Sequence, residues 1–208
     1  MSTAVRIGVR TAWWPGITFP AAVLLAVAGM TLVGQGLYIH AKARLGQVLL
    51  ERAFAVSVAT GEPVKPWPWA DTWPVARIEA PRLKKSAIVL HGSSGQALAF
   101  GPGHLEGTPA AGERGTAVYA AHRDTHFTFL ADLRSGDEIR VILRSGARLR
   151  FRVVGTSVVH WNASGIDLLA DERALVLATC WPFEARTAGP LRYLVHAEAI
   201  EDTADLSP

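Results

Sequence analysis

The sequence has a single cysteine, Cys180, among its 208 residues. One cysteine excludes an internal disulfide framework. If the domain lies outside the cytoplasm, its surroundings would also tend to oxidise an idle exposed thiol. A lone thiol at the end of the apolar run 175–180 is therefore a candidate nucleophile. The alternative is a buried cysteine that packs as a small hydrophobic side chain.

The charged residues show no concentration of one sign. The 21 basic and 18 acidic side chains leave a net charge of +3, and acidic residues stand between many of the basic ones. Nucleic-acid binding needs a concentrated basic stripe with aromatic platforms, so this class of function is excluded. The sequence also lacks internal repeats and low-complexity tracts, and half of its residues are apolar. These properties predict one folded domain with an appendage.

The segment 16–39 contains no charged side chain. About 20 such residues cross the hydrocarbon core of a bilayer as a helix, and Trp13, Trp14 and Tyr38 fit the two membrane interfaces. A cleaved signal peptide has an apolar region of only about 7–15 residues, so the greater length favours a retained anchor. The A-x-A match at 41–43 leaves cleavage open.

Lysines and arginines flank this segment on both sides and do not decide its orientation. Because the preceding tail 1–15 is short, we expect it in the cytoplasm, with a signal anchor over 16–39 and the rest of the chain outside.

A juxtamembrane helix and a linker are expected over 40–72. Apolar residues recur at helical spacing from residue 41 to about residue 59, and glycine and prolines then end the pattern. Three tryptophans follow within 67–74, and we interpret them as covering the domain or touching the membrane interface. The apolar positions of the helix are Leu45, Leu49, Ala53 and Val56.

The remaining chain, 73–200, consists of short apolar runs separated by glycine and proline, and a tail follows at 201–208. A series of such runs with little helix predicts a mainly β domain, a closed or nearly closed barrel. We expect a hairpin connection at 144–147 and a helical turn at 130–133. The predicted strands are 86–90, 116–121, 138–143, 147–154, 174–179 and 191–199.

Two residues could act together with Cys180. His122 follows an apolar strand, and an imidazole with a pKa near about 6.5 exchanges protons at neutral pH. A thiol with a pKa near about 8.5 needs such a base or a cation to become an effective nucleophile. Arg192 lies early in the last predicted strand, and its fixed fork of donors suits a developing oxyanion. The neighbouring Arg123 and Asp124 are expected to pair with nearby side chains instead.

His122 and His126 form an H-x-x-x-H pattern. In an extended segment the two rings would lie about 13 Å apart, too far to share a metal. No glutamate follows the first histidine and no third ligand is evident. The sequence therefore predicts no metal site.

The order of His122, Thr179-Cys180 and Arg192 behind one membrane span resembles the sortases, cysteine transpeptidases of bacterial surfaces. The resemblance covers about residues 73–200. Its motifs are Gly-Pro-Gly-His at 101–104, Ala-Ala-His-Arg-Asp at 120–124, Leu-Ala-Thr-Cys at 177–180 and Leu-Arg-Tyr at 191–193.

The segments 122–127 and 179–183 are similar to the Gram-negative branch, class GN. Two features depart from the family pattern: Ala121 stands where glycine is common, and Val-Leu-Ala-Thr-Cys at 176–180 replaces Thr-Leu-x-Thr-Cys. Neither change removes a reactive group, so both bear on substrate preference more than on activity.

The resemblance implies an eight-stranded barrel with the three residues in one groove. Cys180 would attack the threonine carbonyl of an LPxTG-like sorting signal, and His122 would protonate the leaving amine and later deprotonate the incoming one. Arg192 would hold the substrate and stabilise the oxyanion, while Thr179 and Ala178 would contact the substrate. No cofactor or metal is implied. The implied partners are a sorting-signal protein, an amine acceptor of the cell envelope and the inner membrane, with the catalytic domain in the periplasm.

Three alternatives stay open at this point. An L,D-transpeptidase is another extracytoplasmic cysteine enzyme, but its Ser-x-Gly-Cys type motif is missing before Cys180. A non-catalytic, membrane-tethered β module would bury Cys180 and tolerate the loss of His122. A cysteine protease would use water, not an amine, to discharge the thioester.

Overall fold

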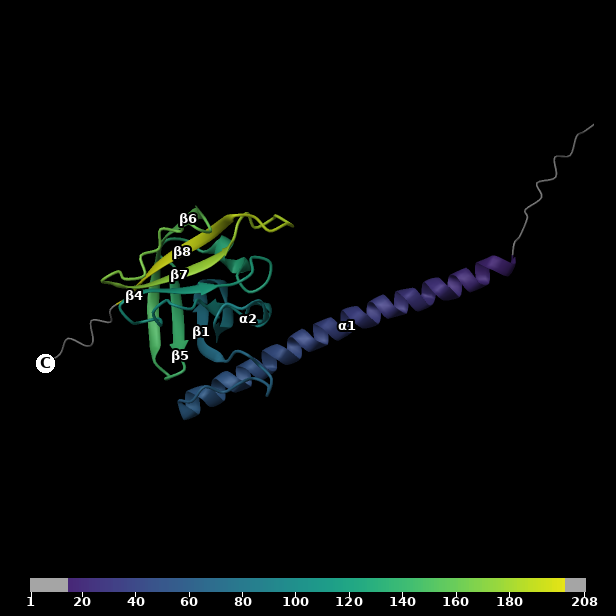
Figure 1. Ribbon diagram of the computed structural model, residues 1–208, viewed down its shortest axis with the longest axis horizontal. Coiled ribbons are helices and arrows are strands. Elements are labelled where there is room, and N and C mark those ends of the chain that lie inside the picture. The colour runs from purple at the N-terminus through teal and green to yellow at the C-terminus, as the bar shows by residue number, and fades with distance from the viewer. Residues whose placement is uncertain (1–14, 201–208) are drawn as a thin grey trace, which may run out of the picture. The chain divides into compact units, whose positions relative to one another are not determined.

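The computed structural model describes residues 15–200, with side chains from residue 19 onward. Most of the expected cytoplasmic tail, Trp13, Trp14 and the tail 201–208 lie outside the described residues. Residues up to Arg44 and residues from Leu45 onward form two units, and each is described by itself. Figure 1 shows a long helix and a β-barrel.

The first unit contains the beginning of helix α1 (Pro15–Thr60), which is continuous through the expected anchor and juxtamembrane segments. Within the described residues, α1 is the one helix long and apolar enough to cross a membrane. Its apolar side chains are exposed in this part, Leu24, Leu32 and Leu37 among them. Apolar surface without a protein partner, on a helix of this length, fits a membrane anchor or a signal sequence.

The end of α1, from Leu45 to Thr60, packs on the barrel in the second unit. Leu50 and Phe54 are buried in a cluster with Ile88, Leu90 and Ala97. The helix expected here is present, and of its four apolar positions Ala53 is buried and Leu49 is half-buried. Leu45 is 59% exposed and Val56 is 41% exposed.

The helix fits closely against Phe100. A Cβ atom on Gly46 would lie 3.1 Å from the Phe100 ring, and Gln47 Nε2 donates to the Phe100 carbonyl at 2.7 Å. A glycine and a glutamine at the contact carry no hydrophobic signal, so hydrophobic periodicity does not reveal this contact.

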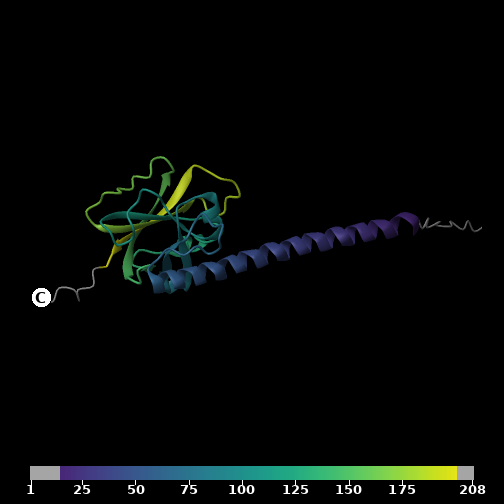
Figure 2. The same cartoon turned by 60° about the horizontal axis from the view of Figure 1, so that its bottom comes forward.

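Eight strands close into a barrel in the order β1-β2-β3-β4-β7-β8-β6-β5, which confirms the expected mainly β, closed eight-stranded architecture (Figures 1 and 2). Three short helices lie between them: η1 (Pro81–Leu83), α2 (Gly95–Phe100) and η2 (Thr128–Asp132). The strands are β1 (Pro74–Ala80), β2 (Lys85–His91), β3 (Gly103–His104), β4 (Gly115–Ala120), β5 (Glu138–Leu143), β6 (Arg148–His160), β7 (Arg173–Cys180) and β8 (Leu191–Ala199).

Alternation along the strands separates two apolar groups. On β7, Leu175 and Leu177 belong to the main core, whereas Val176 belongs to a smaller cluster with Val118 of β4 and Leu194 of β8. Successive side chains of a strand point to opposite faces. Odd-numbered residues of β7 therefore face the barrel interior, and even-numbered residues face outward.

We predict that Leu50→Ala lowers the free energy of unfolding by about 2–5 kcal/mol, because it leaves a cavity where the helix meets the barrel. Urea unfolding of the full chain in detergent micelles, followed by tryptophan fluorescence, measures this. The matched control is Val48→Ala, an exposed position on the same helix, with an expected change within about 0.5 kcal/mol. Equal losses in the two variants would contradict this packing.

Candidate active site

The register of three neighbouring strands brings the predicted reactive residues to one edge of the barrel. β4 and β7 are parallel, with Ala120 opposite Ala178, and the Ala121 amide donates to the Ala178 carbonyl at 3.1 Å. The same register, continued by two residues, places His122 level with Cys180. β7 and β8 are antiparallel, and Cys180 pairs directly with Arg192.

The three side chains also share a face. Thr179 is buried and Tyr193 packs against the main core, so Cys180 and Arg192, next to them in sequence, point the other way. Ala121 also belongs to the main core, and His122, which follows it beyond the end of β4, is exposed. His122, Cys180 and Arg192 therefore lie on the outer face, where His122 is exposed and the other two are half-buried. Cys180 is a free thiol. A candidate nucleophile and a cation thus occupy paired positions on β7 and β8, and a candidate acid–base group lies two residues beyond the end of β4.

Arg192 is oriented by carbonyls close to it in sequence. Its Nη1 donates to the carbonyls of Gly189 at 2.8 Å and Leu191 at 2.9 Å. Both hydrogen bonds are made by Nη1, so Nε and Nη2 take no part in them. A guanidinium presents five donors in a fixed fork, and part of the fork is thus left to meet a ligand.

Thr179 lies on the opposite face from Cys180. It is buried, with 2% of its surface exposed, and its hydroxyl donates to the Ala121 carbonyl at 2.8 Å. This bond ties the end of β7 to the residue that precedes His122. Ala178 is half-buried on the same face as Cys180 and packs against the small outer cluster.

The segment after His122 turns back on itself. The Phe127 amide donates to the His122 carbonyl at 3.2 Å, so the extended geometry assumed for the H-x-x-x-H pattern was wrong. Burial lowers the pKa of His126, and the nearby His122 lowers it further. Across residues 15–200 no group of three histidine, cysteine, aspartate or glutamate side chains is placed to hold a metal ion.

The model of the sortase domain matches residues 78–200 of this sequence. The match covers more than half of the chain and includes the predicted site residues His122, Cys180 and Arg192. The chain belongs to the sortase family. Sortases are transpeptidases of a family separate from the L,D-transpeptidases, so this membership decides against that alternative.

Relatives in this family agree on the fold. Sortase D of Bacillus subtilis is 29% identical over 124 residues, which span 59% of this chain and 62% of that protein. The structure of sortase A from Corynebacterium diphtheriae is 26% identical with a TM-score of 0.57, over 66% of this chain and 65% of that one. A Clostridium perfringens sortase D5 transpeptidase, 22% identical, matches in fold with a TM-score of 0.61 over 76% of this chain and 99% of that one. The chain thus spans less than two thirds of the length of the first two relatives.

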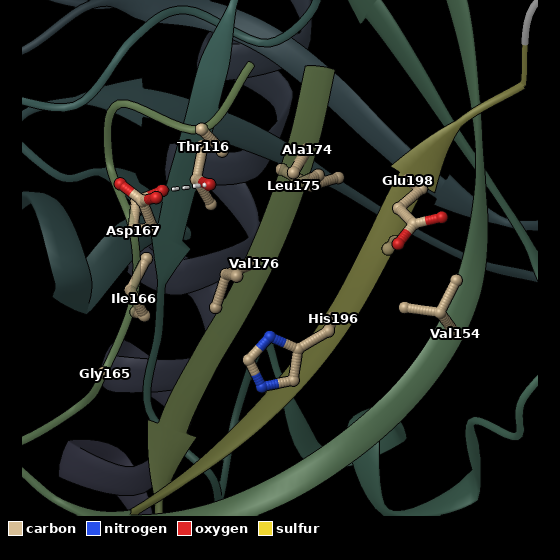
Figure 3. Close-up of a pocket in the computed structure, with 12 residues that line it drawn as sticks. Thr116, Val154, Gly165, Ile166, Asp167, Ala174, Leu175, Val176, His196 and Glu198 are labelled. Atoms are coloured by element: carbon tan, nitrogen blue, oxygen red, sulfur yellow. Dashed lines mark hydrogen bonds between the residues drawn. The ribbon is translucent and has the colours of Figure 1, made fainter. Parts of the chain in front are cut away.

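A pocket of about 160 Å³ lies further along the outer face of β7 and β8 in this sortase (Figure 3). Val176 and His196 pair across the two strands and line it together with Ile166. Cys180 lies four positions after Val176 on β7, or about 13 Å away. The loop over the pocket is held by the Thr116 hydroxyl, which donates to the Asp167 carbonyl at 2.6 Å, the dashed line in Figure 3.

His196 is half-buried in this pocket, with its Nε2 2.8 Å from the Ser157 hydroxyl. Burial lowers the pKa of its imidazole. The folded protein therefore favours the neutral ring.

Sequence reasoning missed two features around the site. Arg123 was expected to pair with neighbouring side chains, but its guanidinium donates to the carbonyls of Ala185 and Thr187 in the loop between β7 and β8. The same loop begins with an aromatic cluster in which Trp181 and Phe183 contact Tyr193. No local pattern signals the Arg123 contacts, because the carbonyls it binds lie more than 60 residues further along the chain.

We predict that Thr179→Val destabilises the protein by about 1–2 kcal/mol, because the Ala121 carbonyl loses its buried donor. Urea unfolding of the full chain measures this change. Thr156→Val, at an exposed position of β6, is the matched control and is expected to change stability by less than about 0.5 kcal/mol. A neutral effect of Thr179→Val would show that this bond does not hold the two strand ends together.

The lowered pKa of His196 predicts a pH dependence of stability. The unfolded chain takes up a proton at this ring near about pH 6.5, before the folded protein does, so acidification favours unfolding. The free energy of unfolding should fall as pH decreases from about 7 to 5, and His196→Gln should reduce that fall. His160→Gln, at an exposed histidine, serves as the control. An unchanged slope in His196→Gln would contradict the assignment.

Proposed function

We propose that this chain is a membrane-anchored cysteine transpeptidase of the Gram-negative sortase class, which cleaves an LPxTG-like sorting signal and transfers the acyl group to an amine. The observation that carries the proposal is the register of β4, β7 and β8, which aligns His122, Cys180 and Arg192 on one outer face. A structural cysteine needs neither of these partners, whereas a nucleophile needs both a proton carrier and a site for negative charge.

The reaction proceeds in two halves. In the first, the Cys180 sulfur attacks the carbonyl carbon of the threonine, and the peptide bond to the next residue breaks. His122 gives its proton to the departing amine, and the acyl group remains on sulfur as a thioester. In the second half, an incoming amine loses a proton to His122 and attacks the thioester, which releases Cys180 and forms the new amide.

Arg192 stabilises the oxyanion that forms in both halves. Its Nη1 is already bound to the Gly189 and Leu191 carbonyls, which limits the movement of the guanidinium. Donors that are oriented before the reaction contribute more than donors that must reorganise during it. Nε and Nη2 are therefore the groups assigned to the substrate oxygen.

The substrate peptide lies along the outer face beside β7. Ala178 is half-buried on this face next to the apolar cluster, and its small side chain leaves room for the peptide backbone. Thr179 points into the barrel, so its contribution is to hold the Ala121 carbonyl, and with it the start of the His122 segment. Peptide contact is thus assigned to Ala178, and a positioning role to Thr179.

The first part of α1 is the proposed anchor. Its exposed apolar side chains and its length fit a single span, with the tail 1–15 in the cytoplasm and the catalytic domain in the periplasm, at the inner membrane. The class assignment rests on the motifs at 122–127 and 179–183. The second motif forms the aromatic contacts of Trp181 and Phe183 with Tyr193.

Intact-mass spectrometry of the full chain in detergent micelles, mixed with a panel of LPxTG-like peptides, tests the proposal. We expect an adduct on the wild-type protein that triglycine discharges into a ligated product, and no adduct on Cys180→Ala. His122→Ala should slow acylation by about 10²–10⁴-fold and Arg192→Ala by about 10²–10³-fold. Arg192→Lys should not restore the wild-type rate, because an ammonium lacks the fork of donors.

Arg173→Ala is the matched control for Arg192, since this exposed arginine lies at the other end of β7. Its activity should equal that of the wild type. An adduct that water discharges while triglycine has no effect would indicate a protease. Wild-type turnover by Cys180→Ala, or the absence of any adduct together with resistance of native Cys180 to iodoacetamide, would overturn the proposal and favour a binding module.

A further inference from the structure

Arg123 is the one arginine within residues 19–200 that the structure buries. Only 9% of its surface is exposed. Its Nη2 donates to two carbonyls, those of Ala185 and Thr187, the second at 2.8 Å. Its Nη1 is also buried and has no hydrogen-bond partner among the described residues. The buried charge therefore depends on these two loop carbonyls, and the loop and the guanidinium must move together.

The loop in question, residues 181–190, joins Cys180 to Arg192. Two arginines bind backbone carbonyls in this loop and at the start of β8. Arg123 binds the carbonyls of residues 185 and 187, and Arg192 binds those of residues 189 and 191. The Trp161 amide donates to the Pro190 carbonyl at 2.8 Å. Hydrogen bonds from side chains thus hold much of this loop, whereas backbone hydrogen bonds between strands hold the chain elsewhere in the barrel.

The proposed acid–base group, His122, and Arg123, which binds the loop, are adjacent in sequence. His122 faces outward, and Arg123, the next residue, is directed into the protein. The turn that holds them is closed by the bond from the Phe127 amide to the His122 carbonyl at 3.2 Å. Through Arg123, the segment that positions His122 also fixes the loop that leads into Arg192.

We propose that Arg123 is a positioning residue for transpeptidation, which holds the loop 181–190 so that Arg192 presents its free donors beside Cys180. The inference rests on the proposed function and adds to it a residue outside the three that react. Arg123 does not touch the substrate, because its guanidinium is buried under the loop. A lysine is not expected to replace it fully, since an ammonium is more strongly hydrated than a guanidinium and costs more to bury at these carbonyls.

The first test needs no activity. Arg186 is exposed within the loop and offers a trypsin site, and Arg144, before the turn between β5 and β6, offers a second site as an internal reference. In the full chain in micelles, Arg123→Met should speed cleavage after Arg186 by about tenfold or more, while cleavage after Arg144 changes by less than about twofold. The control variant is Arg148→Met, at an exposed arginine of β6, and should match the wild type. Unchanged cleavage after Arg186 in Arg123→Met would overturn the inference.

The second test asks whether Arg123 acts through Arg192. With a peptide that acylates the wild type, Arg123→Met should lower kcat and kcat/KM for acylation together by about tenfold or more, because the interaction at stake is made in the transition state. The kcat and kcat/KM of Arg123→Lys should lie between those of the wild type and those of Arg123→Met. Alkylation of Cys180 by iodoacetamide should stay at the wild-type rate, which shows that the thiol and its surroundings remain folded.

A double-mutant comparison separates positioning from general destabilisation. In an Arg192→Ala background the loss caused by Arg123→Met should shrink to within about twofold, since the group that Arg123 positions is gone. An equal loss in both backgrounds would overturn the inference and leave the transpeptidase intact. Failure of the wild-type chain to form any acyl-enzyme would instead overturn the proposed function and this role with it, whatever trypsin shows of the loop.

Discussion

Parallel pairing of β4 with β7 is the constraint on which the site depends. Most neighbouring strands of this barrel are antiparallel, and an antiparallel pair would put the end of one strand beside the start of the other. Because β4 and β7 run in the same direction, Cys180 at the end of β7 and His122, two residues beyond the end of β4, reach the same edge. The return of the chain into β8 then supplies Arg192 at the same level. Three residues that span 71 positions of sequence are brought together by strand register alone.

The same alternation that builds the core separates the reactive face from its support. On β7 the Cys180 side chain faces outward, and the Thr179 side chain faces inward to the Ala121 carbonyl. The Cys180 thiol can thus be accessible from outside the barrel while the neighbouring Thr179 side chain is held rigidly in the packed interior. The candidate nucleophile and the hydroxyl that ties the end of β7 to Ala121 thus belong to adjacent residues.

Much of this could be predicted from sequence, because the barrel strands that carry the site are apolar and well bounded. The runs at 116–121, 174–179 and 191–199 correspond to β4, β7 and β8, and the residues at their ends were the candidates for chemistry. The strands that were missed carry weaker signals. In β1 the inward residues Ala76 and Ala80 are too small to mark a face, and β3 has only two residues, one of them Gly103. α2 has six residues in a glycine-rich stretch that favoured a loop.

Contacts across long sequence separation could not be predicted in the same way. The Gly46 contact with Phe100 and the Arg123 bonds to the loop arise only once the barrel is closed. The second of these has a consequence for how the protein can diversify. Arg123 and Arg192 bind carbonyl oxygens, which every residue possesses, and not the side chains of Glu184, Arg186 or Ala188, which are exposed. These side chains can therefore be exchanged without loss of the hydrogen bonds that hold the loop backbone, and under the proposed function the loop could adapt to different peptides in this way.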